Sequence, residues 1–283
     1  MDNIILSVVI PSYNSEQYIE ECLKSLAAEK LDNTEYILVD GGSIDRTMDV
    51  VDKYRDMFHM IISEPDKGQS DAFNKGFLKA RGEYLTWLNS DDVFCPGALK
   101  KVVQWIKKEK KPWYAANLVY INETSQIIRC CQSAGFEKWA LRFGILNVFG
   151  PSSIFHRNLY SKLGPFREDF HYCMDTEYWW RMARNDFQYE RIPYYLWALR
   201  LHDKAKTAKC VLKNHYPPRM LEESNLIHKK YYPSASKLIT KMGRVLVRIW
   251  RIFNCSYIIS GIDTLKNRDR YIKNIKCSSQ EAV

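Results

Sequence analysis

The chain has 283 residues, of which 46% are hydrophobic, so it can bury a core and does not have the composition of a disordered protein. No apolar run is long enough to cross a bilayer without charges, which excludes an ordinary membrane-spanning helix. The net charge is +9, and residues 237–276 hold ten Lys or Arg against two Asp, so +8 of it lies at the C-terminal end.

The first half of the chain alternates predicted strands and helices. Buried-strand runs are predicted at residues 6–10, 36–39, 60–62 and 84–88. Helices are predicted after Asn14, which we expect to be an N-cap, then from about residue 45 and at 72–80. Strands that alternate with helices predict a parallel sheet.

The second half has a looser pattern. We expect elements in this order: a helix at 98–108, a strand at 113–120, a short strand at 150–156 leading into a helix near 158, a helix at 175–184 and an extended segment at 189–201. Pro217 and Pro218 predict a boundary between residues 1–215 and 216–283.

Two adjacent acids, Asp91 and Asp92, follow the predicted strand at 84–88 almost directly. Ligands of open α/β sheets bind outside the carboxyl ends of the strands. Two neighbouring carboxylates repel each other unless a cation joins them. Because hard oxygen ligands suit Mg²⁺ or Mn²⁺, the pattern predicts a divalent cation that carries a phosphate.

The loops after the first two predicted strands lie at the same edge. The first loop has neither a G-x-G-x-x-G nor a P-loop pattern, and Tyr13 reads equally well as a base-stacking residue or as a surface turn. Asp40 ends the second strand, where it could accept a hydrogen bond from a base N–H. For Ser43 and Asp45 we favour helix capping.

The segment at 66–76 places polar side chains around a predicted helix start. Lys67 could contact phosphate, and Asp71 or Asn74 could contact ribose or sugar hydroxyls. The alternative is that Ser70 and Asp71 only cap the helix, because helix starts favour both acids and bound anions.

Taken together, these motifs resemble the family-2 glycosyltransferases over roughly residues 4–205. The motifs in question are Pro11-x-Tyr13-Asn14, Asp40-Gly-Gly-Ser-x-Asp-x-Thr47, Gln69-Ser-Asp-Ala-x-Asn-x-Gly76 and Leu88-Asn-Ser-Asp-Asp92. The resemblance implies a GT-A fold, a Rossmann-like mixed and mostly parallel sheet flanked by helices. It divides residues 1–215 into a nucleotide-sugar-binding half, 1–95, and an acceptor half, 96–215, followed by a basic helical appendage.

The resemblance also implies roles for the donor-side residues. Pro11 and Tyr13 would contact the nucleotide base, Tyr13 by stacking, and Asp40 would bind the base. Asp91 would lie near the ribose, and Asp92 would bind the metal that bridges the donor diphosphate. The first position of the family's D-x-D element is Asn89 here, which leaves open whether Asp91 shares the metal.

On the acceptor side, the segment from Gly150 to Ser153 resembles the acceptor region of the family. The E-D pair of the family corresponds to Met174-Asp175, so Asp175 is the expected general base. Asp175 could instead only cap its helix, and Glu177 is the rival base on a different helix face.

The closing R-x-H element of the family corresponds to Arg200 and His202. Arg200 and also Arg181 could contact phosphate, although Arg181 could equally be a salt-bridge partner. His202 could bind the metal or steady the diphosphate, and a structural histidine is an equally good interpretation.

The implied activity is metal-dependent, inverting transfer of a hexosyl or N-acetylhexosaminyl group from a nucleoside-diphosphate sugar to a hydroxyl of a glycan or lipid-linked acceptor in surface polysaccharide synthesis. A UDP-sugar is favoured, and a dTDP-sugar presents the same base N–H. One alternative is a sugar nucleotidyltransferase, although those enzymes generally have a glycine-rich, basic first loop. The other alternative is a non-catalytic nucleotide-sugar-binding protein.

The charge pattern of the C-terminal region bears on where the protein lies in the cell. Basic residues that line one helix stripe are Lys237, Lys241, Arg244, Arg248 and Arg251, and the rest of that helix is apolar. Such a helix is typical of anionic membrane surfaces, and the alternative is packing on this domain or in a homodimer. No nucleic-acid-reading motif is present, so we expect no nucleic-acid partner.

The cysteines and the N-terminus bear on the compartment. The eight cysteines are scattered without a C-x-x-C pair, which is typical of reduced cytosolic thiols, and no basic leader precedes the first apolar run. We therefore expect a cytoplasmic protein attached peripherally to the inner face of the cell membrane.

Overall fold

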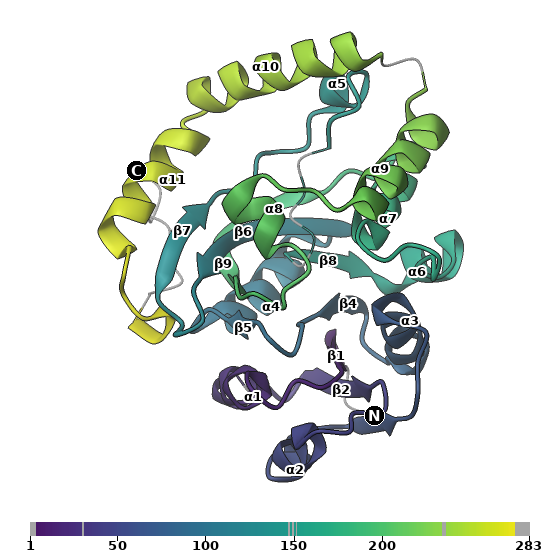
Figure 1. Ribbon diagram of the computed structural model, residues 1–283, viewed down its shortest axis with the longest axis vertical. Coiled ribbons are helices and arrows are strands. Elements are labelled where there is room, and N and C mark those ends of the chain that lie inside the picture. The colour runs from purple at the N-terminus through teal and green to yellow at the C-terminus, as the bar shows by residue number, and fades with distance from the viewer. Residues whose placement is uncertain are drawn as a thin grey trace.

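The computed structural model describes residues 4–29, 31–146, 148, 150, 152–233 and 236–274, except for the side chains at 209 and 237. Figure 1 shows a twisted sheet with helices on both faces and a long C-terminal arm, α10 and α11, that curves around one side of the molecule. The strands of this sheet are β1 Leu6–Ser12, β2 Thr34–Asp40, β3 Met60–Ser63, β4 Tyr84–Trp87, β5 Val93–Phe94, β6 Trp113–Ile121, β7 Ile127–Cys131, β8 Ser153–His156 and β9 Glu190–Arg200.

The strand order in the described residues is β3-β2-β1-β4-β8-β6-β9-β5, with β7 paired to β6. Strands β1, β2, β3 and β4 form parallel pairs, whereas β8 is antiparallel to both β4 and β6. The parallel half leaves the carboxyl ends of its strands at one edge, which is where ligands of such sheets bind. The mixed sheet that was expected is therefore confirmed, with parallel pairing in its first half and antiparallel pairs concentrated in its second half.

Helices cover both faces of the sheet, and each face has its own apolar core. Alternate residues of β1 reach the two cores, since Val8 and Ile10 pack on one side and Val9 on the other. The helices are α1 Ile19–Ala28, α2 Thr47–Asp52, α3 Gln69–Lys79, α4 Ala98–Glu109, α5 Lys138–Leu141, α6 Arg157–Leu163, α7 Met174–Arg184, α8 Ala208–Lys213, α9 Pro218–Tyr231, α10 Lys237–Phe253 and α11 Ser256–Asn267, with 3₁₀ turns at Arg55–Met57 and Ile272–Asn274.

The C-terminal segment packs on the sheet-bearing part of the chain in two places. Helix α9 contacts α7, and α11 runs along the outer edge of β7. There, Thr264 Oγ1 and Ser260 Oγ accept hydrogen bonds from the backbone N–H groups of Cys130 and Gln132 at 3.0 and 2.9 Å. The α11 side chains thus satisfy an edge strand that would otherwise expose its backbone. The predicted division into residues 1–215 and 216–283 stays a prediction.

The helices of the described residues differ in how far they could reach across a bilayer. No single helix is long and apolar enough to cross a bilayer, but α10 and α11 together pass by length and composition, with a bend of 67° between them.

Several boundaries differ from the sequence expectation. Helix α1 begins at Ile19 with Tyr18 as its N-cap, whereas Asn14 lies in the preceding loop with a left-handed φ of 46°, so the expected N-cap at Asn14 is wrong. Strand β7 was not predicted.

Candidate active site

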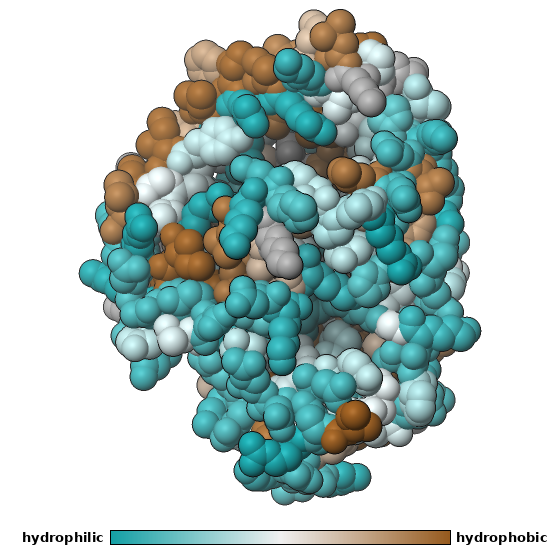
Figure 2. Space-filling view, in the orientation of Figure 1, coloured by the Kyte–Doolittle hydropathy of each residue, from teal (hydrophilic) through white to brown (hydrophobic). Residues whose placement is uncertain are grey.

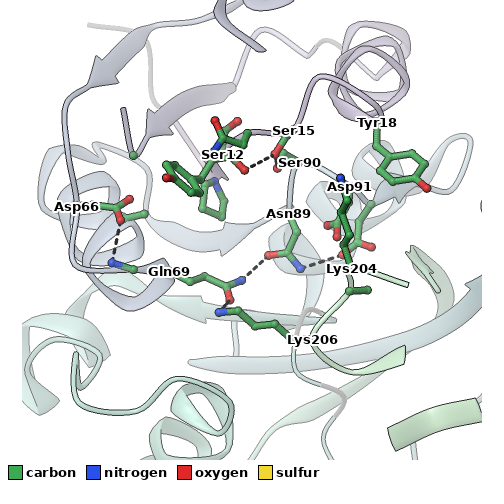
Figure 3. Close-up of a pocket in the computed structure, with 18 of the residues that line it drawn as sticks. Ser12, Ser15, Tyr18, Asp66, Gln69, Asn89, Ser90, Asp91, Lys204 and Lys206 are labelled. Carbon is green, nitrogen blue, oxygen red and sulfur yellow. Dashed lines mark hydrogen bonds between the residues drawn. The ribbon is translucent and has the colours of Figure 1, made fainter. Parts of the chain in front are cut away.

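A pocket of about 1260 Å³ opens where the parallel strands end. Its wall is built from the loops after β1, β2, β3 and β4, the start of α7, and the segment after β9. Figure 3 shows side chains from these loops converging on one hollow. Among the predicted residues, those that line it are Pro11, Tyr13, Asp91, Asp92, Asp175 and Arg200.

The acids after β4 form the centre of the pocket. Asp92 is almost fully buried, with Oδ1 accepting from the Arg200 backbone N–H at 2.8 Å and Oδ2 accepting from Asn89 Nδ2 at 2.9 Å. Burial, and secondly the charge of Asp91, raise the pKa of Asp92 well above its usual range. Asn89, which replaces the first acid of the D-x-D element, therefore supports Asp92 as a hydrogen-bond donor.

The R-x-H element lies behind these acids. The Arg200 side chain is fully buried, and its guanidinium donates to the Asp91 carbonyl, to Ser125 Oγ and to Glu21 Oε2 at 2.7–2.8 Å. This geometry argues against a direct phosphate contact by Arg200, which instead clamps the loops together. His202 Nε2 lies 3.0 Å from Asp91 Oδ2, so its ring orients the Asp91 carboxylate.

The loops after β1 and β2 are bonded to each other. The Asn14 N–H donates to Ser43 Oγ at 2.8 Å, and Asn14 Oδ1 accepts from the Ile44 N–H at 3.0 Å. Asp45 Oδ1 accepts from the Thr47 N–H at the start of α2, but the N-cap of that helix is Arg46, and Ser43 Oγ bonds to Asp40, so neither Ser43 nor Asp45 is the cap that was expected. This arrangement leaves the Tyr13 side chain 61% exposed on the pocket wall, free to stack on a planar ligand.

Asp40 and Asp66 share one corner of the pocket. Asp40 is fully buried and accepts hydrogen bonds from the Gly42 and Ser43 N–H groups and from the hydroxyls of Ser43 and Ser63, at 2.5–3.1 Å. Its oxygens are thus engaged within the fold. Asp66 is the carboxylate that faces the pocket there, packed against Gly41 so closely that a Cβ at 41 would lie 2.6 Å from its Oδ2.

The three predicted residues around α3 play structural parts. Asn74 is buried and exchanges two hydrogen bonds of 2.8 Å with the backbone of Phe166. Asp71 Oδ2 accepts from the Lys67 N–H at 3.0 Å, which is a helix-start bond, and Lys67 Nζ forms an exposed ion pair with Glu168 at 3.2 Å. The structure gives none of these side chains a place on the pocket wall.

Asp175 enters the pocket from the first turn of α7. Its Oδ1 accepts from the Thr176 N–H at 2.6 Å, and its Oδ2 rests against the Cα of Gly150, where any Cβ would overlap it. Burial raises the pKa of Asp175 above its usual range. Part of the acceptor-like segment, Pro151, lies outside the described residues.

The rival base Glu177 points away from the pocket. It is fully buried and is held by the Tyr231 hydroxyl and by Arg181, which also donates to the Leu163 and Pro165 carbonyls. The salt-bridge interpretation of Arg181 is therefore the one that the geometry favours.

Besides Asp66, two groups in and around the pocket were not predicted from the sequence, Lys206 and Glu223. Lys206, after β9, donates to Gln69 Oε1 at 3.2 Å and to the His171 carbonyl at 3.3 Å, and it places an ammonium group on the pocket wall. A Lys-x-Lys pattern directly after the R-x-H element was the signal available.

Glu223 of α9 holds the loop that delivers Asp175. Its carboxylate accepts from the backbone N–H groups of His171, Tyr172 and Cys173 at 2.7, 2.8 and 2.8 Å. The sequence gives no signal for this role, because Glu223 contacts a loop that lies about 50 residues earlier in the chain.

The acids of the pocket suit a divalent cation that is bound jointly by the protein and by the phosphates of a substrate. No cluster of three or more His, Cys, Asp or Glu able to hold a metal occurs in the described ranges. Mg²⁺ commonly uses only one or two carboxylates and completes its shell with water and substrate phosphates. Asp91 and Asp92 supply two such carboxylates side by side on the pocket wall, and each Asp92 oxygen accepts one hydrogen bond, which leaves it a second lone pair for a cation. The residues present therefore fit the expected cation.

Comparison with known proteins agrees with this geometry. Residues 7–164, more than half of the chain, match the family described as "Glycosyl transferase family 2". An uncharacterized glycosyltransferase of Rickettsia prowazekii is 28% identical over 64% of this chain and 59% of its own length. A poly(ribitol-phosphate) beta-N-acetylglucosaminyltransferase, TarS, of Staphylococcus aureus is 28% identical over 54% of this chain and 28% of its own length.

Solved structures share the fold. The crystal structure of S. aureus TarS 1–349 in complex with UDP-GlcNAc superimposes with a TM-score of 0.62 at 20% identity, covering 80% of this chain and 66% of that one. A mannosyltransferase from Pyrobaculum calidifontis in complex with GDP-Man and Mn²⁺ gives 0.56 at 18% identity, over 92% and 86%. The expected GT-A fold is thus confirmed, and the chain belongs to glycosyl transferase family 2.

Proposed function

We propose that this glycosyltransferase inverts the anomeric centre of a sugar as it transfers that sugar from a nucleoside diphosphate to a hydroxyl of a glycan or a lipid-linked acceptor, in surface polysaccharide synthesis. The observation that carries the proposal is that Asp91 and Asp92 from the β4 loop and Asp175 from α7 line one pocket. Its volume of about 1260 Å³ exceeds what most small ligands need, as a donor and an acceptor together require.

A UDP-sugar is the proposed donor, and a dTDP-sugar is the second choice because both bases present an N–H. The support is the likeness to TarS, which was crystallised with UDP and with UDP-GlcNAc. Tyr13 stacks on the base, with Pro11 beside it. Asp66 accepts the base N–H, while Asp40, predicted for that contact, shapes the loop that Asp66 packs against.

Asp91 and Asp92 would hold Mn²⁺ or Mg²⁺, with His202 orienting Asp91. Bound there, the cation supplies positive charge to the diphosphate leaving group. Lys206 stands on the same wall and adds a second positive charge from the protein itself. The likeness to a mannosyltransferase crystallised with Mn²⁺ supports this choice of cofactor.

Asp175 is the proposed general base. As the acceptor oxygen forms its bond to the anomeric carbon, the bond from that carbon to the phosphate oxygen breaks, and its electron pair leaves with the nucleoside diphosphate. The acceptor proton passes to the Asp175 carboxylate, whose pKa is raised toward the working pH by burial. A single displacement of this kind inverts the configuration.

The test begins with a thermal-shift screen of nucleotide sugars with Mn²⁺ and Mg²⁺, since ligands of the folded state raise its stability by mass action. The best donor is then assayed for transfer and hydrolysis in wild type and in Asp175→Asn. We expect a UDP-sugar to give the largest shift and Asp175→Asn to bind it normally but turn it over at least 100-fold more slowly. Full turnover by Asp175→Asn would contradict the base assignment.

A further inference from the structure

Helix α10 has three faces with different chemistry, and the first of them packs inward. Gly243 lies against Phe143, Val247 is buried, and an Arg251 guanidinium nitrogen donates to the Gln132 carbonyl at 2.8 Å. These residues are four apart and so share one side of the helix. Arg251 was expected in the outward basic stripe, and the structure turns it inward instead.

The second face of α10 is apolar and points away from the domain. The seven large residues along it, each 43–82% exposed, are Leu238, Met242, Val245, Leu246, Ile249, Ile252 and Phe253. Helix α11 continues this surface with Tyr257, Ile258, Ile262 and Leu265. Figure 2 shows the result as a hydrophobic band along the upper and left edges, over α10 and α11 of Figure 1. Soluble domains rarely expose a continuous apolar patch of this size.

The third face of α10 is basic and flanks the apolar one. Lys241, Arg244 and Arg248 are exposed there at spacings of three and four, and the helix contains no acid. The Lys237 side chain lies outside the described residues. A helix that is apolar on one side with a basic border is the form that lies in the plane of a membrane interface.

We propose that α10 and α11 form a membrane-docking surface that rests on an anionic bilayer, with the apolar face among the acyl chains and the basic flank at the headgroups. The positive charge of the flank favours an anionic lipid surface over a second copy of the chain as the partner. A two-fold interface through this face would bring two copies of the same basic flank together, and they would repel each other. The two helices lie on the bilayer and do not cross it. The α11 side chains of Ser260 and Thr264 pair with the backbone of β7, and insertion would leave those N–H groups without partners.

This surface gives the expected peripheral location a physical basis, although the part of the predicted 237–276 segment after 274 lies outside the described residues. Docking here would hold the pocket near a lipid-linked acceptor. The docking itself needs neither donor nor catalysis, so its test is independent of the proposed reaction.

The test is sedimentation of the full chain with vesicles, without any nucleotide sugar. We expect binding to vesicles of phosphatidylcholine with phosphatidylglycerol and little binding to phosphatidylcholine alone. Leu238→Glu with Leu265→Glu should reduce the partition coefficient at least tenfold. Leu78→Glu, at a 74% exposed leucine of α3, is the matched control and should bind like wild type.

The basic flank is tested separately. Each Lys or Arg near an anionic surface contributes about 1 kcal/mol, or roughly fivefold in partitioning. Alanine at Lys241, Arg244 and Arg248 should therefore lower binding on the order of 100-fold, whereas Lys100→Ala with Lys107→Ala should change it little. Equal pelleting with neutral and anionic vesicles, or unchanged binding of the α10–α11 variants, would overturn the proposal. A lipid-free dimer that Leu238→Glu with Leu265→Glu dissociates, with no vesicle binding, would identify a second copy as the occupant.

Discussion

Gly150→Ala tests whether the position of the Asp175 carboxylate controls the rate. The substitution adds one methyl group at a point where Asp175 Oδ2 already rests on the glycine Cα. A Cβ there overlaps the oxygen, and neighbouring heavy atoms essentially never come closer than about 3 Å to a Cβ, so the carboxylate must move by more than ~1 Å. Its hydrogen bond to the Thr176 N–H limits the directions in which it can move.

The expected magnitude follows from this displacement. A misplacement of about 1 Å at a reacting group can cost ~100-fold in rate. We therefore expect kcat to fall about 100-fold, while the KM for the donor changes little because Tyr13 and Asp66 are untouched. Overpacking costs typically about 1–3 kcal/mol of stability, so the variant should still fold.

The assay compares kcat, donor KM and Tm for Gly150→Ala and Gly135→Ala. Gly135 is the matched control, since the nearest atom to a Cβ there, Glu137 Oε1, is 3.9 Å away. In an Asp175→Asn background, Gly150→Ala should add no further loss of rate, because both changes act through one group. An unchanged kcat in the single variant, or a full additional loss in the double variant, would refute the reasoning.

Three further predictions concern groups around the pocket. Glu223→Gln replaces one acceptor oxygen with an amide donor that faces backbone N–H groups. It should lower the free energy of unfolding in denaturant by about 2–3 kcal/mol, and it should reduce kcat while changing the donor KM less. Glu222→Gln, at an exposed glutamate of the same helix, is the control and should change neither. Asp175 has a folded pKa raised above its ordinary 3.8, so it destabilises the fold as pH rises through that raised value. Asp175→Asn should thus raise Tm at neutral pH while lowering turnover at least 100-fold, and a gain in Tm that persists below about pH 3.8 would contradict this explanation. Asp66→Asn should weaken the binding of UDP about tenfold in calorimetry, because the base N–H loses its acceptor. Asp203→Asn, at an exposed aspartate, is the control, and an equal loss of affinity in both variants would contradict the proposed contact between Asp66 and the base.

Sequence was informative wherever a local pattern decides the structure. Apolar runs that end in acids or glycines located β1, β2 and β4 to within about two residues. Because the carboxyl ends of parallel strands share one edge, the same reasoning placed Asp91 and Asp92 on the pocket that the structure shows.

Sequence failed where the partner of a side chain lies far along the chain. Arg200 and Asn74 were predicted to bind ligands, yet their polar atoms are used by partners up to 179 and 92 residues away. Asp40 was missed for a local reason, since its oxygens are engaged by the Gly42–Ser43 turn that directly follows it and by Ser63. Conversely, Asp66 faces the pocket because Gly41 has no Cβ to occupy its place. Lys206 faces the pocket because its ammonium group is bonded to the side-chain oxygen of Gln69. Residue type predicts what a side chain can bind, and tertiary packing decides whether that capacity is already used.

The prolines at 217–218 mark a boundary in sequence, but the working parts of the enzyme extend across it. Glu223 lies beyond the matched family segment, and yet it fixes the loop that presents Asp175. Farther along, α11 completes the edge of β7 with two side-chain hydrogen bonds while turning its apolar residues outward. Because this edge strand anchors α11 to the catalytic sheet, a bilayer in contact with α10 and α11 would fix the orientation of the pocket as well as the location of the protein.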